Sequence, residues 1–111
     1  MQAFLLDDLL RSQRDGGAAY QEFLRVPALS AGLYLLPAGG VDPQQPHAED
    51  EVYHVLRGRA TLRVDQREVP VTPGSIVYVP ARLPHRFHSI IEELLVLVWF
   101  APAESSGGAG C

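Results

Sequence analysis

Residues 39–58 have the sequence GGVDPQQPHAEDEVYHVLRG, in which a turn-rich, proline-containing segment leads into a run of β-branched and aromatic residues. Four polar side chains alternate along this stretch and would share one face of an extended chain: Gln45, His47, Glu49 and Glu51. A second histidine cluster, Pro84-His85-Arg86-Phe87-His88, follows farther along. Two imidazoles and a carboxylate brought together suit a divalent metal ion. The sequence therefore predicts a metal site, provided that the fold joins these two regions.

The bulk composition sets the class of protein. With 111 residues, 47% hydrophobic and 20% charged, the chain is long enough for one globular domain with its own core. A net charge of −4 gives no basic footprint, so neither nucleic acid nor a membrane is expected as a partner. All nine basic residues are Arg, which excludes a catalytic lysine. The one cysteine, Cys111, allows no intrachain disulfide.

The N-terminal sequence and the longest apolar runs indicate the cellular compartment to expect. No apolar run approaches the ~20 residues of a membrane-spanning helix. The chain opens with Asp7 and Asp8 instead of the basic residues that begin a secretory signal. We therefore expect a cytoplasmic protein.

The hydrophobic period changes once along the chain. Residues 4–14 have the spacing of a short amphipathic helix, which Gly16-Gly17 would end. From Tyr20 the period is two, and turn signals divide the rest into about eight short strands: 20–25, 29–36, 52–56, 60–64, 68–71, 75–79, 85–90 and 94–101. Arg57-Gly58-Arg59 is expected to form a tight hairpin turn, and Glu92-Glu93 to separate the last two strands. This pattern predicts an all-β sandwich or barrel.

Two motifs in this order resemble those of the cupin family. In the first, Gly39 is followed after five residues by Gln45, then by His47, Glu51 and Gly58 at the family's intervals. In the second, Gly74, Pro80 and His85 are in place, while Arg82 and Ser89 stand where the family has glycine and asparagine. The resemblance implies a double-sheet jelly-roll β-barrel of the small, single-domain cupin type, with a short N-terminal helix. The implied division is helix and linker at 1–19, barrel at 20–102 and a flexible tail at 103–111.

The resemblance also implies a ligand set. Family members typically hold the metal with three histidines and a glutamate, and here Gln45 replaces the first histidine. Carried over by position, the expected ligands are His47, Glu51 and His85, with Gln45 as a candidate fourth. The expected cofactor is one divalent ion, with Fe, Mn, Zn and Ni left open. A metal-free cupin with a polar pocket is the alternative.

The register of the first motif distinguishes neighbouring side chains. Glu49 shares the parity of Glu51, but the interval to Gly58 selects Glu51, and Asp50 should face away. From the same register, three side chains are expected to line the pocket: Tyr53, Val55 and Phe87. His54 and His88 have the opposite parity and should lie outside it. The direction of four further aromatic side chains is left open, because β-bulges can reverse parity: Tyr34, Tyr78, Trp99 and Phe100.

Function remains open between two classes. As an enzyme, the protein would bind a small organic substrate at the metal, and dioxygenase, isomerase and decarboxylase chemistry all fit the resemblance. As a binding or sensor domain, with or without metal, it would act without catalysis. A small-molecule ligand is expected in both cases. A homodimer formed by pairing of the edge strand at 20–25 is the candidate assembly.

Overall fold

The computed structural model describes residues 1–43 and 46–105. Its elements are one helix, α1 (Leu6–Gly16), followed by strands β1 (Tyr20–Val26), β2 (Leu29–Leu36), β3 (Asp50–Val64), β4 (Arg67–Val71), β5 (Ile76–Val79) and β6 (His85–Ala101). All strand pairs are antiparallel. The expected class, all-β with a short N-terminal helix, is confirmed.

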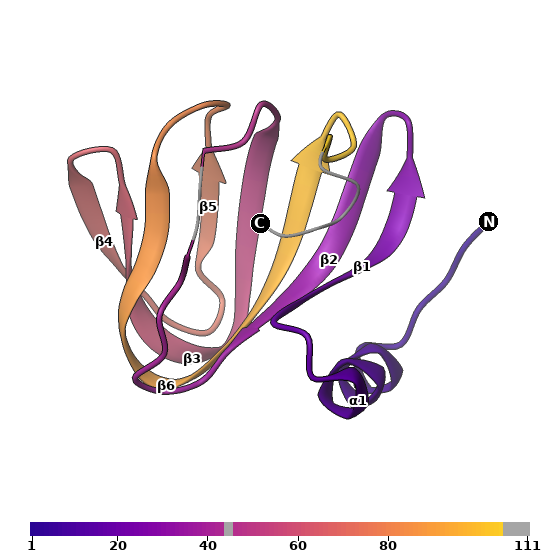
Figure 1. Ribbon diagram of the computed structural model, residues 1–111, viewed down its shortest axis with the longest axis horizontal. Helices are drawn as coiled ribbons and strands as arrows, with labels where there is room; N and C mark the ends of the chain where they lie inside the picture. The colour runs from indigo at the N-terminus through magenta and orange to yellow at the C-terminus, as the bar shows by residue number, and fades with distance from the viewer. Residues whose placement is uncertain (44–45, 106–111) are drawn as a thin grey trace.

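Two long strands, β3 and β6, form the middle of the fold (Figure 1). They pair with each other along most of their length, and both bend, so that the sheet folds over into two facing layers. One layer has the order β1-β2-β6-β3-β5 and contains the second half of β6 and the first half of β3. The other layer contains the opposite halves of β3 and β6, together with β4. The side chains between the layers form the core.

The predicted hairpin at Arg57-Gly58-Arg59 is wrong, because β3 runs without interruption from Asp50 to Val64. Likewise, Glu92 and Glu93 do not end a strand but lie within β6. Register shifts in the β3–β6 pairing between Val55 and Thr61 produce the bend instead of a turn. About eight predicted strands therefore become six in the described residues.

Gly58 is required at this bend for two reasons. Its φ is +94°, a conformation that residues with a side chain rarely adopt. A Cβ atom at this position would also lie 2.2 Å from the carbonyl oxygen of Glu93. The glycine that resembles a hairpin signal in the sequence thus allows β3 and β6 to cross closely where both bend.

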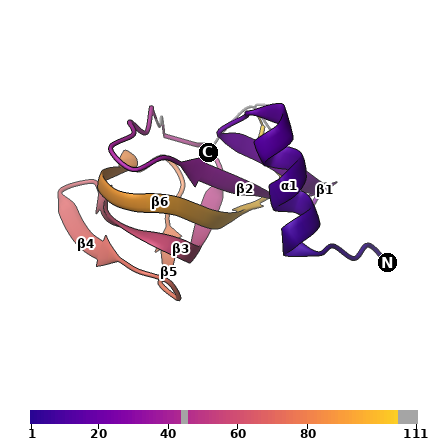
Figure 2. The same cartoon turned by 90° about the horizontal axis from the view of Figure 1, so that it is seen from below.

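Helix α1 covers part of the outer face of the sheet, at the end away from β4 and β5 (Figure 2). Its buried Leu10 packs with Leu33 of β2 and Leu95 of β6. The helix begins at Leu6, two residues after its predicted start at Phe4, and Phe4 and Leu5 are exposed. Gln13, which is 1% exposed, donates hydrogen bonds from Nε2 to the carbonyl oxygens of Ala18, Ala19 and Leu33. These bonds join the end of the helix to the sheet.

The segment after β6 turns back onto the barrel. The backbone N–H of Ala103 donates to the carbonyl of Pro27, and that of Ser105 donates to a carboxylate oxygen of Glu49. The described part of the predicted tail is therefore bonded to the barrel, and the rest of it, including Cys111, lies outside the described residues. No helix among the described residues is long and apolar enough to cross a membrane.

Candidate metal centre

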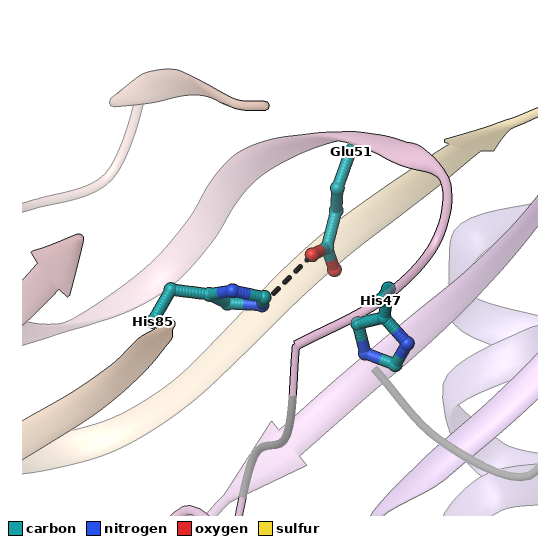
Figure 3. Close-up of side chains that lie close together, drawn as sticks. All are labelled: His47, Glu51 and His85. Atoms are coloured by element: carbon teal, nitrogen blue, oxygen red, sulfur yellow. Dashed lines mark ion pairs between the residues drawn. The ribbon is translucent and has the colours of Figure 1, made fainter. Parts of the chain in front are cut away.

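Three side chains from two distant parts of the sequence meet between the two layers (Figure 3). His47 comes from the segment before β3, Glu51 from the start of β3, and His85 from the first position of β6. One ligand atom of each lies within 4.8 Å of the others. His85 Nε2 is 2.9 Å from Glu51 Oε1. The structure therefore brings together the three residues that the two motifs single out.

The folding of the sheet creates this proximity. Glu51 pairs with Val79 of β5 and Phe100 of β6, in one layer. His85 pairs with Val64 in the other layer. Because β3 and β6 bend, the ends of the two motifs face each other across the barrel.

The site holds buried polar atoms whose lone pairs are not used by hydrogen bonds. Glu51 and His85 are 1% and 7% exposed, and His47 is half-buried. Among the described residues, no partner in hydrogen-bond geometry is found for His47 Nε2, His85 Nε2 or either carboxylate oxygen of Glu51. The Tyr53 hydroxyl and the His85 imidazole act on this carboxylate at close range without that geometry. The short contact between His85 and Glu51 is an ion pair without hydrogen-bond geometry. Buried polar atoms normally have hydrogen-bond partners. The two imidazole nitrogens and the carboxylate therefore fit coordination of a metal ion, which would compensate for their burial.

Burial and mutual contact shift the acid–base properties of the pair. Burial raises the pKa of Glu51 above its ordinary value, although His85, His47 and the hydroxyl of Tyr53 favour the carboxylate and offset part of the shift. Burial by itself would lower the pKa of His85, but the adjacent Glu51 carboxylate outweighs this and raises it. Because the rise at His85 requires an ionised Glu51, the two shifts belong to the pair as a whole and do not add.

Aromatic side chains surround the three polar groups. Tyr53 and Phe87, 0% and 1% exposed, are in contact, with ring centroids 4.8 Å apart and the ring planes tilted by 58°. The ring of Tyr53 lies 6.0 Å from that of His85, and Phe100 meets His47 edge-on at 5.0 Å. Val55 is fully buried in the same core cluster. Of the aromatics left open by the sequence, Tyr34 and Phe100 face inward, whereas Tyr78 and Trp99 are exposed.

None of the described neighbouring candidates, Glu49, Asp50 and His88, belongs to the cluster. Gln45, the candidate fourth ligand, lies outside the described residues. Glu49 is buried but does not belong to the cluster, and one of its oxygens accepts the Ser105 N–H at 3.1 Å. Asp50 is exposed, as expected, and accepts the backbone N–H of Ala81. His88 bonds to Glu68 on the outside.

A surface cavity of about 270 Å³ adjoins the site. It is lined by Pro46, Arg63, Asp65, Pro84, His85 and Arg86. Since His85 forms part of its wall, a ligand in this cavity would lie next to the cluster.

Two buried acidic residues near the site were not identified from the sequence. Asp42 is 4% exposed and accepts the hydroxyl of Tyr34 and, at 2.8 Å, the backbone N–H of Phe87. Glu104 is 1% exposed, with Oε1 4.0 Å from Nδ1 of His47. No periodic sequence pattern identifies either residue as buried, because both lie in irregular segments. Tertiary packing alone brings these segments against the barrel.

Comparisons with known proteins agree with this architecture. The cupin domain family (Cupin_2) matches residues 32–101. The uncharacterized protein SCO3923 of Streptomyces coelicolor is 50% identical over 105 residues, covering 95% of this chain and 100% of its own length. The crystal structure of TT1209 from Thermus thermophilus superposes with a TM-score of 0.73 at 27% identity, covering 93% of this chain and 99% of that one.

A further solved structure shows the fold alone. The DMSP lyase DddQ from Ruegeria pomeroyi DSS-3 superposes with a TM-score of 0.68 at 22% identity, covering 78% of this chain and 49% of that one. The family match extends over more than half of the chain, and the Streptomyces relative is half identical over its full length. This chain therefore belongs to the cupin family.

Proposed function

We propose that this protein binds one divalent metal ion through His47, Glu51 and His85 and presents it to a small organic ligand. The observation that carries the proposal is the convergence of these three buried donors, whose lone pairs lack hydrogen-bond partners among the described residues. Neighbouring donors each ~2.1 Å from one ion are about 3.0–3.4 Å apart in octahedral or tetrahedral geometry. The donor atoms of the cluster lie within 4.8 Å of one another, so they would approach by no more than about 1.8 Å to hold a metal.

The donor set limits the choice of ion. Two imidazoles and one carboxylate suit Fe, Mn, Zn or Ni and leave coordination positions open for a ligand. A bound ion of this kind supplies Lewis acidity, or O₂ activation if it is redox-active. The residues around it have their own roles: the Tyr53 hydroxyl favours the charged form of Glu51, while the rings of Phe100 and Tyr53 exclude water from His47 and His85, respectively.

The cavity beside His85 favours an anionic ligand. Arg63 and Arg86 both line it, and they are directly opposite each other on β3 and β6. Like charges in this arrangement repel each other. Arg63 lies 3.9 Å from Glu68, whereas no ion pair of Arg86 is found among the described residues. The two arginines outnumber Asp65 among the charged lining residues, so a small molecule that bears a carboxylate would relieve this repulsion in the cavity. Enzymatic conversion of a small organic molecule at the metal is the activity we favour.

A non-catalytic binding domain is the second candidate. The 2.9 Å contact between His85 and Glu51 gives the two groups a direct ion pair that requires no metal. A metal-free pocket closed by this pair could bind a ligand without any chemistry.

Metal analysis of untagged protein tests the proposal. We expect near-stoichiometric Fe, Mn, Zn or Ni in the wild type, or after loading with each ion, and loss of it in the His47→Ala/His85→Ala double variant. His54→Ala/His88→Ala is the matched control, since these histidines lie outside the cluster, and it should retain the metal. Absence of bound metal in the wild type under all of these conditions would reject the metal site. Stoichiometric metal without O₂ consumption or conversion of a panel of phenolic, thiol and carboxylate compounds would favour the binding domain.

A further inference from the structure

The segment after β6 places an additional carboxylate beside His47. The Glu104 side chain is almost fully buried, and its Oε1 lies 4.0 Å from Nδ1 of the imidazole. The backbone of this residue is fixed by other contacts: its N–H donates to Ser30 Oγ at 2.9 Å, and its carbonyl accepts the Arg25 guanidinium at 2.7 Å. Residues of β1 and β2 thus hold the backbone of Glu104 so that its side chain reaches the site.

The two nitrogens of His47 have different surroundings. Nδ1 is on the side of Glu104, whereas Nε2 is buried and has no hydrogen-bond partner among the described residues. A histidine that binds metal through one nitrogen commonly donates its other N–H to a carboxylate, which fixes the tautomer and the ring orientation. A movement of about 1 Å would bring Glu104 within hydrogen-bonding distance of Nδ1.

Charge supports the same arrangement. A buried carboxylate is costly unless a positive charge or hydrogen-bond donors lie close to it. A cation on Nε2 of His47 would make the Nδ1–H a stronger donor toward Glu104.

We propose that Glu104 is a positioning residue for His47: its carboxylate accepts the Nδ1–H and leaves Nε2 to bind the metal. The inference rests on the proposed function as far as the metal is concerned, but the tautomer that it assigns to His47 does not require one. It gives a role in the site to a segment that lies outside both histidine motifs.

The chain offers a matched control for the experiment. Glu49 is a second buried carboxylate at the same end of the barrel and contacts the same C-terminal segment through the Ser105 N–H. Glu104→Gln and Glu49→Gln each remove one negative charge and preserve side-chain shape, but only the first changes the group beside Nδ1 of His47. Glu104→Asp keeps the charge and serves as the rescue variant.

Two readouts are measured on each full-length variant. The first is the affinity for Zn²⁺ by competition with a chelator. The second is the tautomer of His47 in metal-free protein at alkaline pH, from ¹⁵N NMR of the imidazole assigned with His47→Ala. We expect the wild type to carry the proton on Nδ1, and Glu104→Gln to populate both tautomers and to weaken Zn²⁺ binding roughly 10- to 100-fold. Glu49→Gln should match the wild type, and Glu104→Asp should recover much of the affinity.

Three results would overturn the inference. One is a wild-type His47 protonated on Nε2, and another is equal behaviour of Glu104→Gln and Glu49→Gln in both readouts. The third is loss of a coordinated oxygen from the metal's X-ray absorption spectrum in Glu104→Gln, which would make Glu104 a ligand. If the wild type binds no metal, the proposed function fails, while the NMR readout still decides the role of Glu104.

Discussion

Nε2 of His85 lies 2.9 Å from Oε1 of Glu51, and the two side chains are only 2% and 1% exposed. They come from opposite layers of the folded sheet, so their contact joins the two walls of the barrel inside the core. A buried ion pair of this kind contributes little net stability, because removing both charges from water offsets their attraction. Its presence at the meeting point of the two motifs is better explained by metal binding than by stability.

Metal should stabilise the fold through this pair. An ion that binds only the native state at 100 times its Kd raises the free energy of unfolding by about 2.7 kcal/mol. We expect the melting temperature of the wild type to rise with the bound ion and to fall with chelator, and Glu51→Gln to show neither change. Glu68→Gln, an exposed carboxylate, is the control and should respond as the wild type does. An equal response to the ion in Glu51→Gln would remove Glu51 from the ligand set.

The metal-free protein should lose stability as the pH rises. The pKa values of Glu51 and His85 are both raised above their ordinary values of 4.5 and 6.5, so the native state binds the protons more tightly than the unfolded chain does. That stabilisation is complete below the unfolded pKa and is lost as the pH rises through the folded pKa. Urea denaturation with chelator present should therefore show a free energy of unfolding that falls above pH 4.5 through Glu51 and above pH 6.5 through His85, and a shallower fall in Glu51→Gln. A flat profile in the wild type would contradict the raised values.

Metal affinity should increase as the pH rises, whereas the stability of the metal-free protein should decrease. The ion requires deprotonated ligands and must displace the protons that Glu51 and His85 hold, so the affinity for Zn²⁺ should increase over the same pH range. Calorimetry in buffers of different ionisation enthalpy would count the protons released. Binding without proton release at a pH below 6.5 would argue against these two ligands.

Gly58 should tolerate no side chain. Gly58→Ala places a Cβ 2.2 Å from the carbonyl oxygen of Glu93 at a φ of +94°. Gly74→Ala is a matched control, because its φ is +95° but no atom lies within 4 Å of the added Cβ. We expect the control to lose about 1–2 kcal/mol from backbone strain alone, and Gly58→Ala to lose roughly 1–3 kcal/mol more from the clash. Equal losses in denaturant titrations would show that β3 and β6 do not cross closely at this bend.

Arg86 should select anionic ligands. Once a carboxylate ligand is found, Arg86→Ala should weaken its binding by roughly 10-fold or more, as expected for loss of one charged hydrogen bond of about 1.5–3 kcal/mol. An uncharged analogue should bind both proteins alike. Arg59→Ala, which removes an exposed guanidinium 3.8 Å from Glu92, is the control and should have no effect. A similar loss for charged and uncharged ligands would point to a change in cavity shape instead of charge recognition.

Local sequence patterns were sufficient to predict several strands and the three residues of the candidate site. The sequence predicted β2 at its observed bounds and β1 to within one residue, because the turn-forming residues around Pro27 and Pro37 limit both strands locally. The intervals from Gly39 to Gly58 and from Gly74 to His85 singled out three side chains that meet in space, and parity correctly placed Glu51, Tyr53 and Phe87 inside. The metal itself and the role of Gln45 stay predictions.

Tertiary structure decided where the strands bend and what covers the site. Gly58 resembles a turn in the sequence, yet it lies within β3, because a glycine with positive φ serves a hairpin and a bulge equally well. The bulges there reverse the inward parity of β3, from odd positions such as Tyr53 to even positions such as Leu62, which no local pattern can specify. Asp42 and Glu104 lie in irregular segments whose positions depend on distant strands. Their approach to the site follows from the packing of the whole barrel and not from the residues that adjoin them in sequence.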